Sequence, residues 1–239
     1  MKPVRVLQLY PRHMNIYGDE GNALVLRRRL EWYGFAPHLL RYDVGDAFPD
    51  DVDVVLGGGG QDSGQGAIQE DLLAIGPRLR ELADDGTPML VICGMYQLFG
   101  HFFRTREGAE LTGVGVLDVE TYGKDERLIG NVVATSEEFG EVVGYENHSG
   151  QTFLGPQAQP FARVTRGAGN NTADDTEGAR YRNVIGSYLH GSLLPKNPRV
   201  ADFLIGAAVE RRYREPLPAG AVDDSLAELA REVARSRPR

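Results

Sequence analysis

Residues 88–100 read PMLVICGMYQLFG, an apolar run that meets a glycine and then a second apolar stretch. A continuous apolar run of this kind is typical of a parallel strand that is buried on both faces of a sheet. Gly94 permits a tight turn after that strand, and the residues that follow can form a helix. The chain's single cysteine, Cys93, is therefore expected at the turn from a buried strand into a helix.

The segments before this turn alternate between strand and helix patterns. Apolar strands are expected in 4–11, 37–44 and 51–60, and the last of these ends in four glycines. Helical spacing occurs in 18–35, which Gly34 would terminate, and in 67–86, which Pro77 would kink or divide. Strands and helices that alternate with short connections predict an α/β fold, a layered sheet with helices on both faces.

The second half of the chain is richer in β patterns. Strand segments separated by glycines and charges are expected in 113–122, 127–136, 141–154, 161–167 and 183–191. A helix is then expected in 196–213, with Asn197 as its cap and Pro198 at its first position. We expect one domain over residues 1–213, followed in 214–239 by a linker and an amphipathic helix.

That last helix has its own signals. Ser225 and Glu228 have the spacing of a capping box, and Leu226, Leu229 and Val233 form one apolar stripe. The stripe is expected to dock on the domain or on a partner.

Composition narrows the class of protein. The chain has 239 residues, of which 41% are hydrophobic and 25% charged, as in an ordinary globular protein. Its formal charge of −8 argues against a general attraction to nucleic acid or anionic lipid. It has one cysteine, no signal-peptide pattern and no apolar run long enough to span a membrane. We expect a cytoplasmic protein.

Cys93 has two interpretations. A free cysteine is often an inert core residue. A cysteine at the carboxyl end of a buried strand, with a helix N-terminus beneath it that stabilises the thiolate, is instead placed to act as a nucleophile. A nucleophile needs a base, and the five histidines are His13, His38, His101, His148 and His190. His190 ends an apolar strand and is the best placed, whereas His148 in the polar loop GYENHSG is its competitor.

The glycine-rich stretch LGGGGQDSGQG, residues 56–66, also has more than one interpretation. It satisfies neither the Walker nor the dinucleotide-binding spacing, so it is a poor nucleotide site. Its amides could instead form an oxyanion hole, or the stretch could be a flexible turn. Arg127 is by default a solvated charge, unless the substrate carries a carboxylate that its planar guanidinium grips.

Three motifs resemble those of a known family. CGMYQLFG (93–100), GYENHSG (144–150) and SYLHG (187–191) resemble the cobyric-acid-synthase-like class I glutamine amidotransferases, which have a flavodoxin-like fold. YPRHMNIYGDEGN (10–22) and RLIGN (127–131) resemble more narrowly the glutaminase subunit of lipid II isoglutaminyl synthase, the GatD type. The resemblance covers roughly residues 4–213.

The resemblance implies a glutaminase. Cys93 would attack the side-chain amide of L-glutamine, and His190 would protonate the departing ammonia. Amides near Gly58 and Gly59, with Gly94, would hold the oxyanion. Arg127 would bind the substrate, and the matching motifs also place Gln97 and His148 at the substrate site. No metal site is expected.

The resemblance also implies a partner. In the family the ammonia passes to a Mur-ligase-like, ATP-dependent subunit, the MurT type, which amidates the D-glutamate of the lipid II stem peptide. The chain has no Walker-type loop of its own, so no cofactor is expected here, and ATP and Mg²⁺ are expected on a separate subunit in a heterodimer. The alternatives are a stand-alone cysteine hydrolase of the same fold and a catalytically inactive binding subunit.

Two residues depart from the family pattern. Met95 lies two residues after Cys93, at a position where many related proteins have glycine in the turn that carries the cysteine. The turn in this chain must therefore accommodate a side chain. Ser192 stands where amidotransferases with a triad have a glutamate after the histidine. A carboxylate that orients His190 must therefore be remote in this chain, absent, or contributed by the partner.

Overall fold

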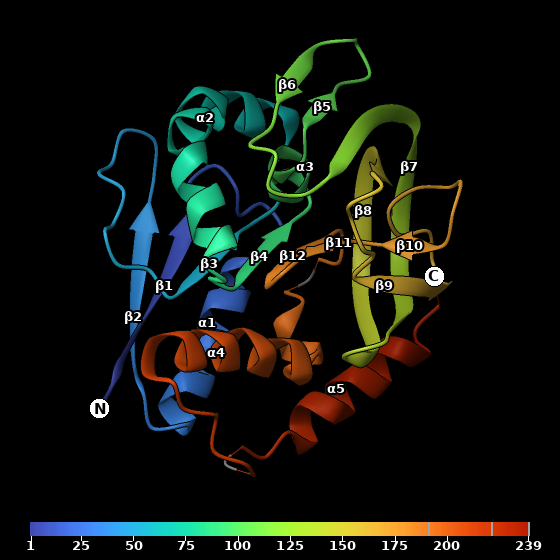
Figure 1. Ribbon diagram of the computed structural model, residues 1–239. Coiled ribbons are helices and arrows are strands. Elements are labelled where there is room, and N and C mark those ends of the chain that lie inside the picture. Colours follow the sequence, from blue (N-terminus) through green and yellow to red (C-terminus); the bar gives the residue numbers. More distant parts are fainter. Residues whose placement is uncertain (191, 221, 239) are drawn as a thin grey trace.

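A six-stranded sheet forms the centre of the molecule in a computed structural model that describes residues 1–190, 192–220 and 222–238 (Figure 1). Gly191, which follows His190, lies outside the described residues. The strand order is β11 (Ala179–Tyr181), β12 (Val184–Ser187), β4 (Met89–Ile92), β3 (Val54–Gly57), β1 (Pro3–Leu9) and β2 (Ala36–Tyr42). All neighbours pair in parallel except β11 with β12.

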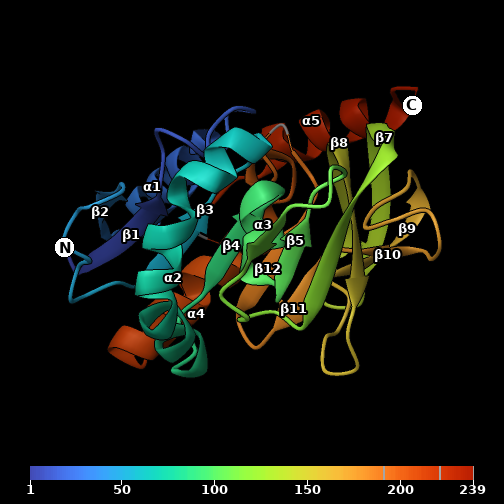
Figure 2. The same cartoon turned by 90° about the horizontal axis from the view of Figure 1, so that it is seen from above.

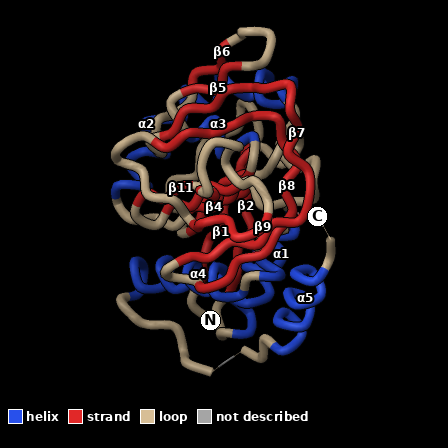
Figure 3. The backbone as a smooth tube through the Cα atoms, turned by 90° about the vertical axis from the view of Figure 1, so that its right-hand side faces the viewer, coloured by secondary structure: helices blue, strands red, loops and turns tan. Residues whose placement is uncertain are grey.

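Helices cover both faces of this sheet, as Figure 3 shows from the side. On one face α1 (Glu20–Trp32) contacts α4 (Pro198–Tyr213). On the other face α2 (Asp62–Asp84) contacts α3 (Gly94–Phe99). The carboxyl ends of parallel strands meet at one edge of such a sheet, where sites of α/β proteins form. The α/β class and the helices on both faces are confirmed.

A second sheet packs beside the first (Figure 2). It contains β5 (Phe102–Arg104), β6 (Glu110–Thr112), β7 (Val119–Ser136), β8 (Gly140–Leu154), β9 (Ala162–Arg166) and β10 (Thr176–Glu177). β7 and β8 form a long antiparallel hairpin with a register shift between Gly123 and Leu128. The two strands expected in 113–122 and 127–136 are thus one strand, because the charged residues between them form a bulge and not a turn.

Two details of the helices differ from expectation. α2 begins at Asp62 and runs through Pro77 undivided. Its buried side chains, including Ile68, Leu72 and Leu79, hold the helix together although the proline lacks an N–H donor.

Within the described residues, no helix has both the length and the apolar character that crossing a bilayer requires.

The caps of the last two helices also differ. Asn197 stands at the N-cap of α4, but its side chain bonds the backbone of Val143 and Leu193 and caps nothing. The capping box in α5 (Ser225–Ser236) is wrong. Asp224 is the N-cap residue, and Glu228 pairs with Arg231 at the next turn.

Candidate active site

Cys93 lies in a sharp turn between β4 and α3, as the sequence pattern predicts. It is 5% exposed, and its backbone has φ 50° and ψ −110°, outside the regions that L residues normally occupy. Its N–H donates to the Ser187 carbonyl (2.8 Å), which ties the turn to the end of β12. A strained backbone of this kind costs about 1–3 kcal/mol and is typical of functional sites. The geometry favours a nucleophile over an inert core thiol.

His190 comes to this turn from the end of the neighbouring strand β12. Its N–H donates to the Tyr145 carbonyl (2.7 Å), and its side chain is 1% exposed. Burial lowers the pKa of His190, but its interactions with Cys93 and with Asp19 outweigh burial and raise the pKa to about 10. His190 is therefore held as an imidazolium, with Cys93 and Asp19 as the groups that stabilise its charge.

Asp19 supplies a buried carboxylate that the sequence reasoning missed. Its Oδ2 lies 3.8 Å from Nδ1 of His190 and accepts a hydrogen bond from the Gly59 N–H (2.7 Å). Asp19 is the N-cap residue of α1, but its side chain makes no capping hydrogen bond. The 3.8 Å separation is too long for a hydrogen bond. Asp19 thus stabilises the charge of His190 without fixing the orientation of its ring.

Tyr17 covers the other side of His190. The two ring centroids are 4.3 Å apart, and the Tyr17 hydroxyl accepts a hydrogen bond from Arg127 Nη2 (3.2 Å). A Cβ atom on Gly59 would come within 2.7 Å of His190 Cε1 and 3.2 Å of the Tyr17 ring. A glycine at position 59 is therefore required for the close approach of these two rings.

Cys93 opens into a cavity of about 330 Å³, within the size range of small-molecule sites. The cavity brings together the expected substrate residues Arg127, Gln97 and His148, which lie on β7, α3 and β8. Arg127 donates from Nε to Asn147 Oδ1 (2.8 Å), and among the described residues it has no carboxylate partner. Its guanidinium is thus oriented at the cavity wall and available for a substrate carboxylate.

His148 is the weaker candidate for the base. Its ring stacks on Tyr188 with centroids 3.6 Å apart, and its Nδ1 donates to the Gly150 carbonyl (2.7 Å). Burial lowers its pKa to about 3, so it stays neutral. Gln97 is also fixed, because it donates to the Tyr188 hydroxyl (3.0 Å) and accepts from Gln65 (2.8 Å). The structure therefore favours His190 over His148 as the base, and the assignment stays a prediction.

The glycine loop after β3 does not present its amides as expected. The Gly59 N–H is already taken by Asp19, and neither Gly58 nor Gly59 lines the cavity. Gly60 does line it, and a Cβ atom on Gly94 would lie 3.2 Å from the Gly60 nitrogen. Gly60 is therefore a further candidate for the oxyanion donor, next to Gly94, which does not line the cavity either. The identity of the oxyanion donors stays a prediction.

Comparison with known proteins agrees with this geometry. A model of the CobB/CobQ-like glutamine amidotransferase domain matches residues 5–198. The chain belongs to this family. It is a glutamine amidotransferase.

Two similar proteins are named subunit GatD of lipid II isoglutaminyl synthase (glutamine-hydrolyzing). The one from Staphylococcus aureus (strain N315) is 39% identical over 83% of this amidotransferase and 82% of its own length. The one from Streptococcus pneumoniae (strain ATCC BAA-255 / R6) is 34% identical over 96% and 90%. A probable cobyric acid synthase of Methanothermobacter thermautotrophicus is 30% identical over 73% of the chain, but only 36% of that synthase is matched.

Solved structures agree on the fold. A glutamine amidotransferase of Thermotoga maritima aligns with 97% of the chain and 93% of its own, with a TM-score of 0.56 and 16% identity. A second glutamine amidotransferase structure gives a TM-score of 0.58 over 84% of the chain and 98% of its own, with 16% identity. The expected flavodoxin-like class I amidotransferase fold is confirmed.

The first departure from the family pattern, Met95, has a structural solution. Its side chain is fully buried and lies over Gly57, where a Cβ atom would come within 2.4 Å of Met95 Cγ. The amidotransferase accommodates the larger elbow residue by having no side chain at the end of β3.

The second departure from the family pattern, Ser192, forms a hydrogen bond to the loop before α1 and not to His190. Its Oγ donates to the Gly18 carbonyl (2.8 Å), and a Cβ atom on Gly21 would come within 2.2 Å of that Oγ. Ser192 thus fastens the loop that carries Asp19. The acid near His190 comes from the start of α1 and not from the residues after the histidine.

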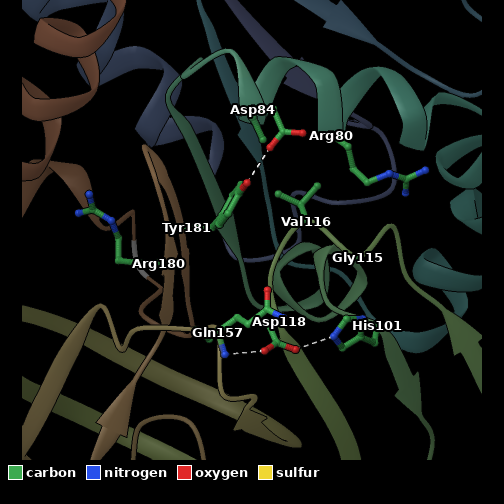
Figure 4. A pocket seen from close by; sticks show the side chains of 11 residues that line it. Arg80, Asp84, His101, Gly115, Val116, Asp118, Gln157, Arg180 and Tyr181 are labelled. Atoms are coloured by element: carbon green, nitrogen blue, oxygen red, sulfur yellow. Dashed lines mark hydrogen bonds and ion pairs between the residues drawn. The ribbon is translucent and has the colours of Figure 1, made fainter.

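A separate cavity, about 250 Å³, is lined in part by α2, by β11 and by the segment before β7, and contains neither Cys93 nor His190 (Figure 4). Its two carboxylates are already paired: Asp84 accepts from the Tyr181 hydroxyl (2.6 Å), and Asp118 contacts His101 (2.7 Å). Among residues 1–190, 192–220 and 222–238, no cluster of three or more His, Cys, Asp or Glu side chains is placed to hold a metal.

The charge around His190 leads to a prediction. Replacing Asp19 by Asn removes one of the two groups that raise the pKa of His190, so this pKa is expected to fall from about 10. The raised pKa means that the imidazolium contributes stability below about pH 6.5 and loses it as the pH rises through about 10. Side-chain ¹⁵N NMR of His190 from pH 6 to 10.5 measures the change. An unaltered titration in Asp19→Asn would contradict the electrostatic role of Asp19.

Proposed function

We propose that this chain is the glutaminase subunit of a lipid II isoglutaminyl synthase. Cys93 hydrolyses L-glutamine through a thioester, and the ammonia passes to a Mur-ligase-like, ATP-dependent subunit of the MurT type. That subunit amidates the D-glutamate of the stem peptide to D-isoglutamine during peptidoglycan biosynthesis. The observation that carries the proposal is the placement of Cys93 and Arg127 on the wall of one cavity, together with a buried His190 that interacts with Cys93. The similarity to the two GatD subunits supports the choice of acceptor.

The chemistry follows from the residues present. The Cys93 thiolate attacks the carboxamide carbon of glutamine, and the resulting oxyanion accepts hydrogen bonds from the amides of Gly60 and Gly94. His190 donates a proton to the nitrogen as the C–N bond breaks, which releases ammonia. Water then attacks the thioester and gives a proton to His190. The C–S bond breaks, and glutamate leaves while the thiolate is restored.

Arg127 and the partner complete the proposal. The Arg127 guanidinium binds the α-carboxylate of glutamine, while Gln97 and His148 shape the wall of the substrate site. ATP and Mg²⁺ act on the synthetase subunit, and we place the heterodimer in the cytoplasm, with membrane-bound lipid II reached through the partner. The intact Cys93 and His190 argue against an inactive binding subunit.

The experiment is reconstitution of the purified chain with the synthetase subunit of the same organism. Glutamine, ATP and lipid II together should yield amidated lipid II, whereas glutamine alone yields glutamate and free ammonia. Rapid glutamine turnover by the isolated chain, with no amidated product in the mixture, would favour the stand-alone hydrolase.

The incomplete support of His190 predicts that the partner stimulates the reaction. Nδ1 of His190 has no hydrogen-bond partner among the described residues, and Asp19 is 3.8 Å away. Because the His190 side chain is only 1% exposed, a carboxylate of the partner would hold the ring if binding of the partner opens access to Nδ1. The complex should then hydrolyse glutamine with a kcat roughly ten-fold or more above that of the isolated chain. Steady-state kinetics should compare the isolated chain, the complex, and complexes whose partner interface acids are changed to Ala. Equal kcat values in all three would indicate a simple Cys–His pair assisted by Asp19 alone.

A further inference from the structure

The last helix, α5, is attached to the body of the molecule by its polar side. Arg235 pairs with Glu141 (3.2 Å), and Arg231 donates to the backbone carbonyl of Glu141 (3.3 Å) at the start of β8. Nearby, the Asn131 side chain donates to the Pro238 carbonyl (2.6 Å). Figure 1 shows α5 along the ends of β7 and β8. Its inward contacts are therefore mainly hydrogen bonds and ion pairs.

The apolar stripe of α5 points away from the body. Leu226 is 79% exposed, Leu229 62% and Val233 46%, and no residue of the helix is buried. Amphipathic helices normally turn their apolar face to the core. An inverted orientation leaves apolar side chains in water, and such exposed patches typically mark interaction sites. The stripe does not dock on its own domain.

Leu226, the first residue of the stripe, lines a groove whose other wall is α1. The groove has a volume of about 710 Å³ and is mostly apolar, with Leu24 and Trp32 of α1 facing Leu226 and Ala230 of α5. Leu24 is 53% exposed and Trp32 is 55% exposed. Its floor includes Leu194 of the short helix η1 (Leu194–Lys196), which follows His190 in the chain. The groove thus joins the segment that leads out of the active site.

An ion-pair network holds the groove in shape. Arg29, which is 4% exposed, donates to both carboxylate oxygens of Asp202 (2.7 and 2.8 Å) and to Asp224 at the N-cap of α5. A buried guanidinium with two carboxylates has defined geometry and a high cost of separation. The start of α5 is therefore fixed against α1 and α4, and the groove is preformed.

The charges of α5 argue against a lipid surface. Helices that lie on membranes carry a basic polar face, whereas α5 has two arginines and two glutamates and the whole chain carries −8. The comparisons with known proteins favour a protein partner over a lipid surface as the occupant of the groove. The family model ends at residue 198, so α5 lies beyond the shared domain, and the matched cobyric acid synthase carries further sequence in its own chain. The S. pneumoniae glutaminase subunit, which is similar over 96% of this chain, is named as one subunit of a synthase.

We propose that the groove between α1 and α5 receives an apolar segment of the synthetase subunit. This inference rests on the proposed function and adds the surface through which the two subunits bind. An apolar helix or loop seated there would bury Leu226 together with Leu24 and Trp32. Its contact with η1 places the partner next to the segment that carries His190.

The test uses the purified full-length chain and the synthetase subunit of the same organism. Leu226→Glu places a charge in the groove, and Trp32→Ala removes its largest apolar side chain. Each variant is expected to weaken the complex at least ten-fold by isothermal titration calorimetry. Leu73→Glu is the matched control, because Leu73 is an exposed leucine (38%) on α2, a helix on the other face of the sheet. Its Kd and the basal glutaminase activity of all variants should equal those of the wild type.

Other outcomes separate the inference from the proposed function. If the wild type binds the synthetase subunit and both groove variants bind it equally well, the groove is not the interface although the function stands. If the wild type forms no complex, both ideas fail. A wild-type homodimer that Leu226→Glu dissociates would identify a second copy as the occupant. Binding to phosphatidylglycerol vesicles that Leu226→Glu abolishes would identify a membrane. Either result overturns the inference.

Discussion

Replacement of Cys93 by alanine is expected to abolish glutamate release, with a loss of at least about a thousand-fold in kcat. The thioester forms only on the sulfur, and no other cysteine exists in the chain to replace it. Glutamine turnover in a coupled glutamate dehydrogenase assay measures the loss. Wild-type activity in Cys93→Ala would refute the assignment of the nucleophile.

The same variant should keep its fold. Alanine and cysteine have similar backbone preferences, so the strained φ of 50° is neither relieved nor made worse, and only one buried sulfur is lost. Circular dichroism and the Kd for the synthetase subunit should therefore match the wild type. The glutamine analogue 6-diazo-5-oxo-norleucine provides an independent check, because it alkylates an active thiolate. Mass spectrometry should find the label on Cys93, and a label elsewhere would count against the mechanism.

Residues that follow a buried strand were predictable from the sequence. Cys93 and His190 each end an apolar run, and parallel neighbouring strands bring such ends to the same edge of a sheet. The pattern therefore indicated both positions without knowledge of the fold. It ranked His190 above His148 but left His148 as a competitor. That distinction depends on burial and on the Tyr188 ring stacked against His148, which are properties of the packed molecule.

Asp19 was not predicted as the acid, although it lies within the motif YPRHMNIYGDEGN (10–22), because no local pattern pairs it with a histidine. It lies just before α1, and only the folded chain brings it near His190, which follows β12. Its position at a helix N-cap even suggests a different role, since aspartate at that position usually bonds the helix backbone.

The orientation of α5 could not be predicted from the sequence for a similar reason. Periodicity identifies an apolar stripe, but it does not say whether the stripe faces the core or the solvent.

For Arg127, the sequence alone favoured a solvated surface charge over a residue that binds a substrate carboxylate. In the structure Asn147 and Tyr17 hold its guanidinium at the cavity wall near Cys93. Neither neighbour is a carboxylate, so the positive charge is not neutralised by them. A guanidinium oriented by neutral groups retains its attraction for an anionic substrate.

Arg127→Ala is therefore expected to lower kcat/KM for glutamine roughly a hundred-fold, which corresponds to about 3 kcal/mol, the scale of two charge-assisted hydrogen bonds. Arg127→Lys keeps the charge but loses the planar pair of donors, so it should recover only part of this loss. Tyr17→Phe is the control, because it removes the hydroxyl contact to Arg127 while leaving the ring over His190. It should cost far less than either change. If Arg127 binds the α-carboxylate, its replacement should matter only for substrates that carry this group. Glutamine analogues that lack the α-carboxylate should therefore react equally slowly with the wild type and with Arg127→Ala. If Arg127→Ala keeps wild-type kinetics with glutamine, the side chain is a surface charge and the carboxylate is bound elsewhere.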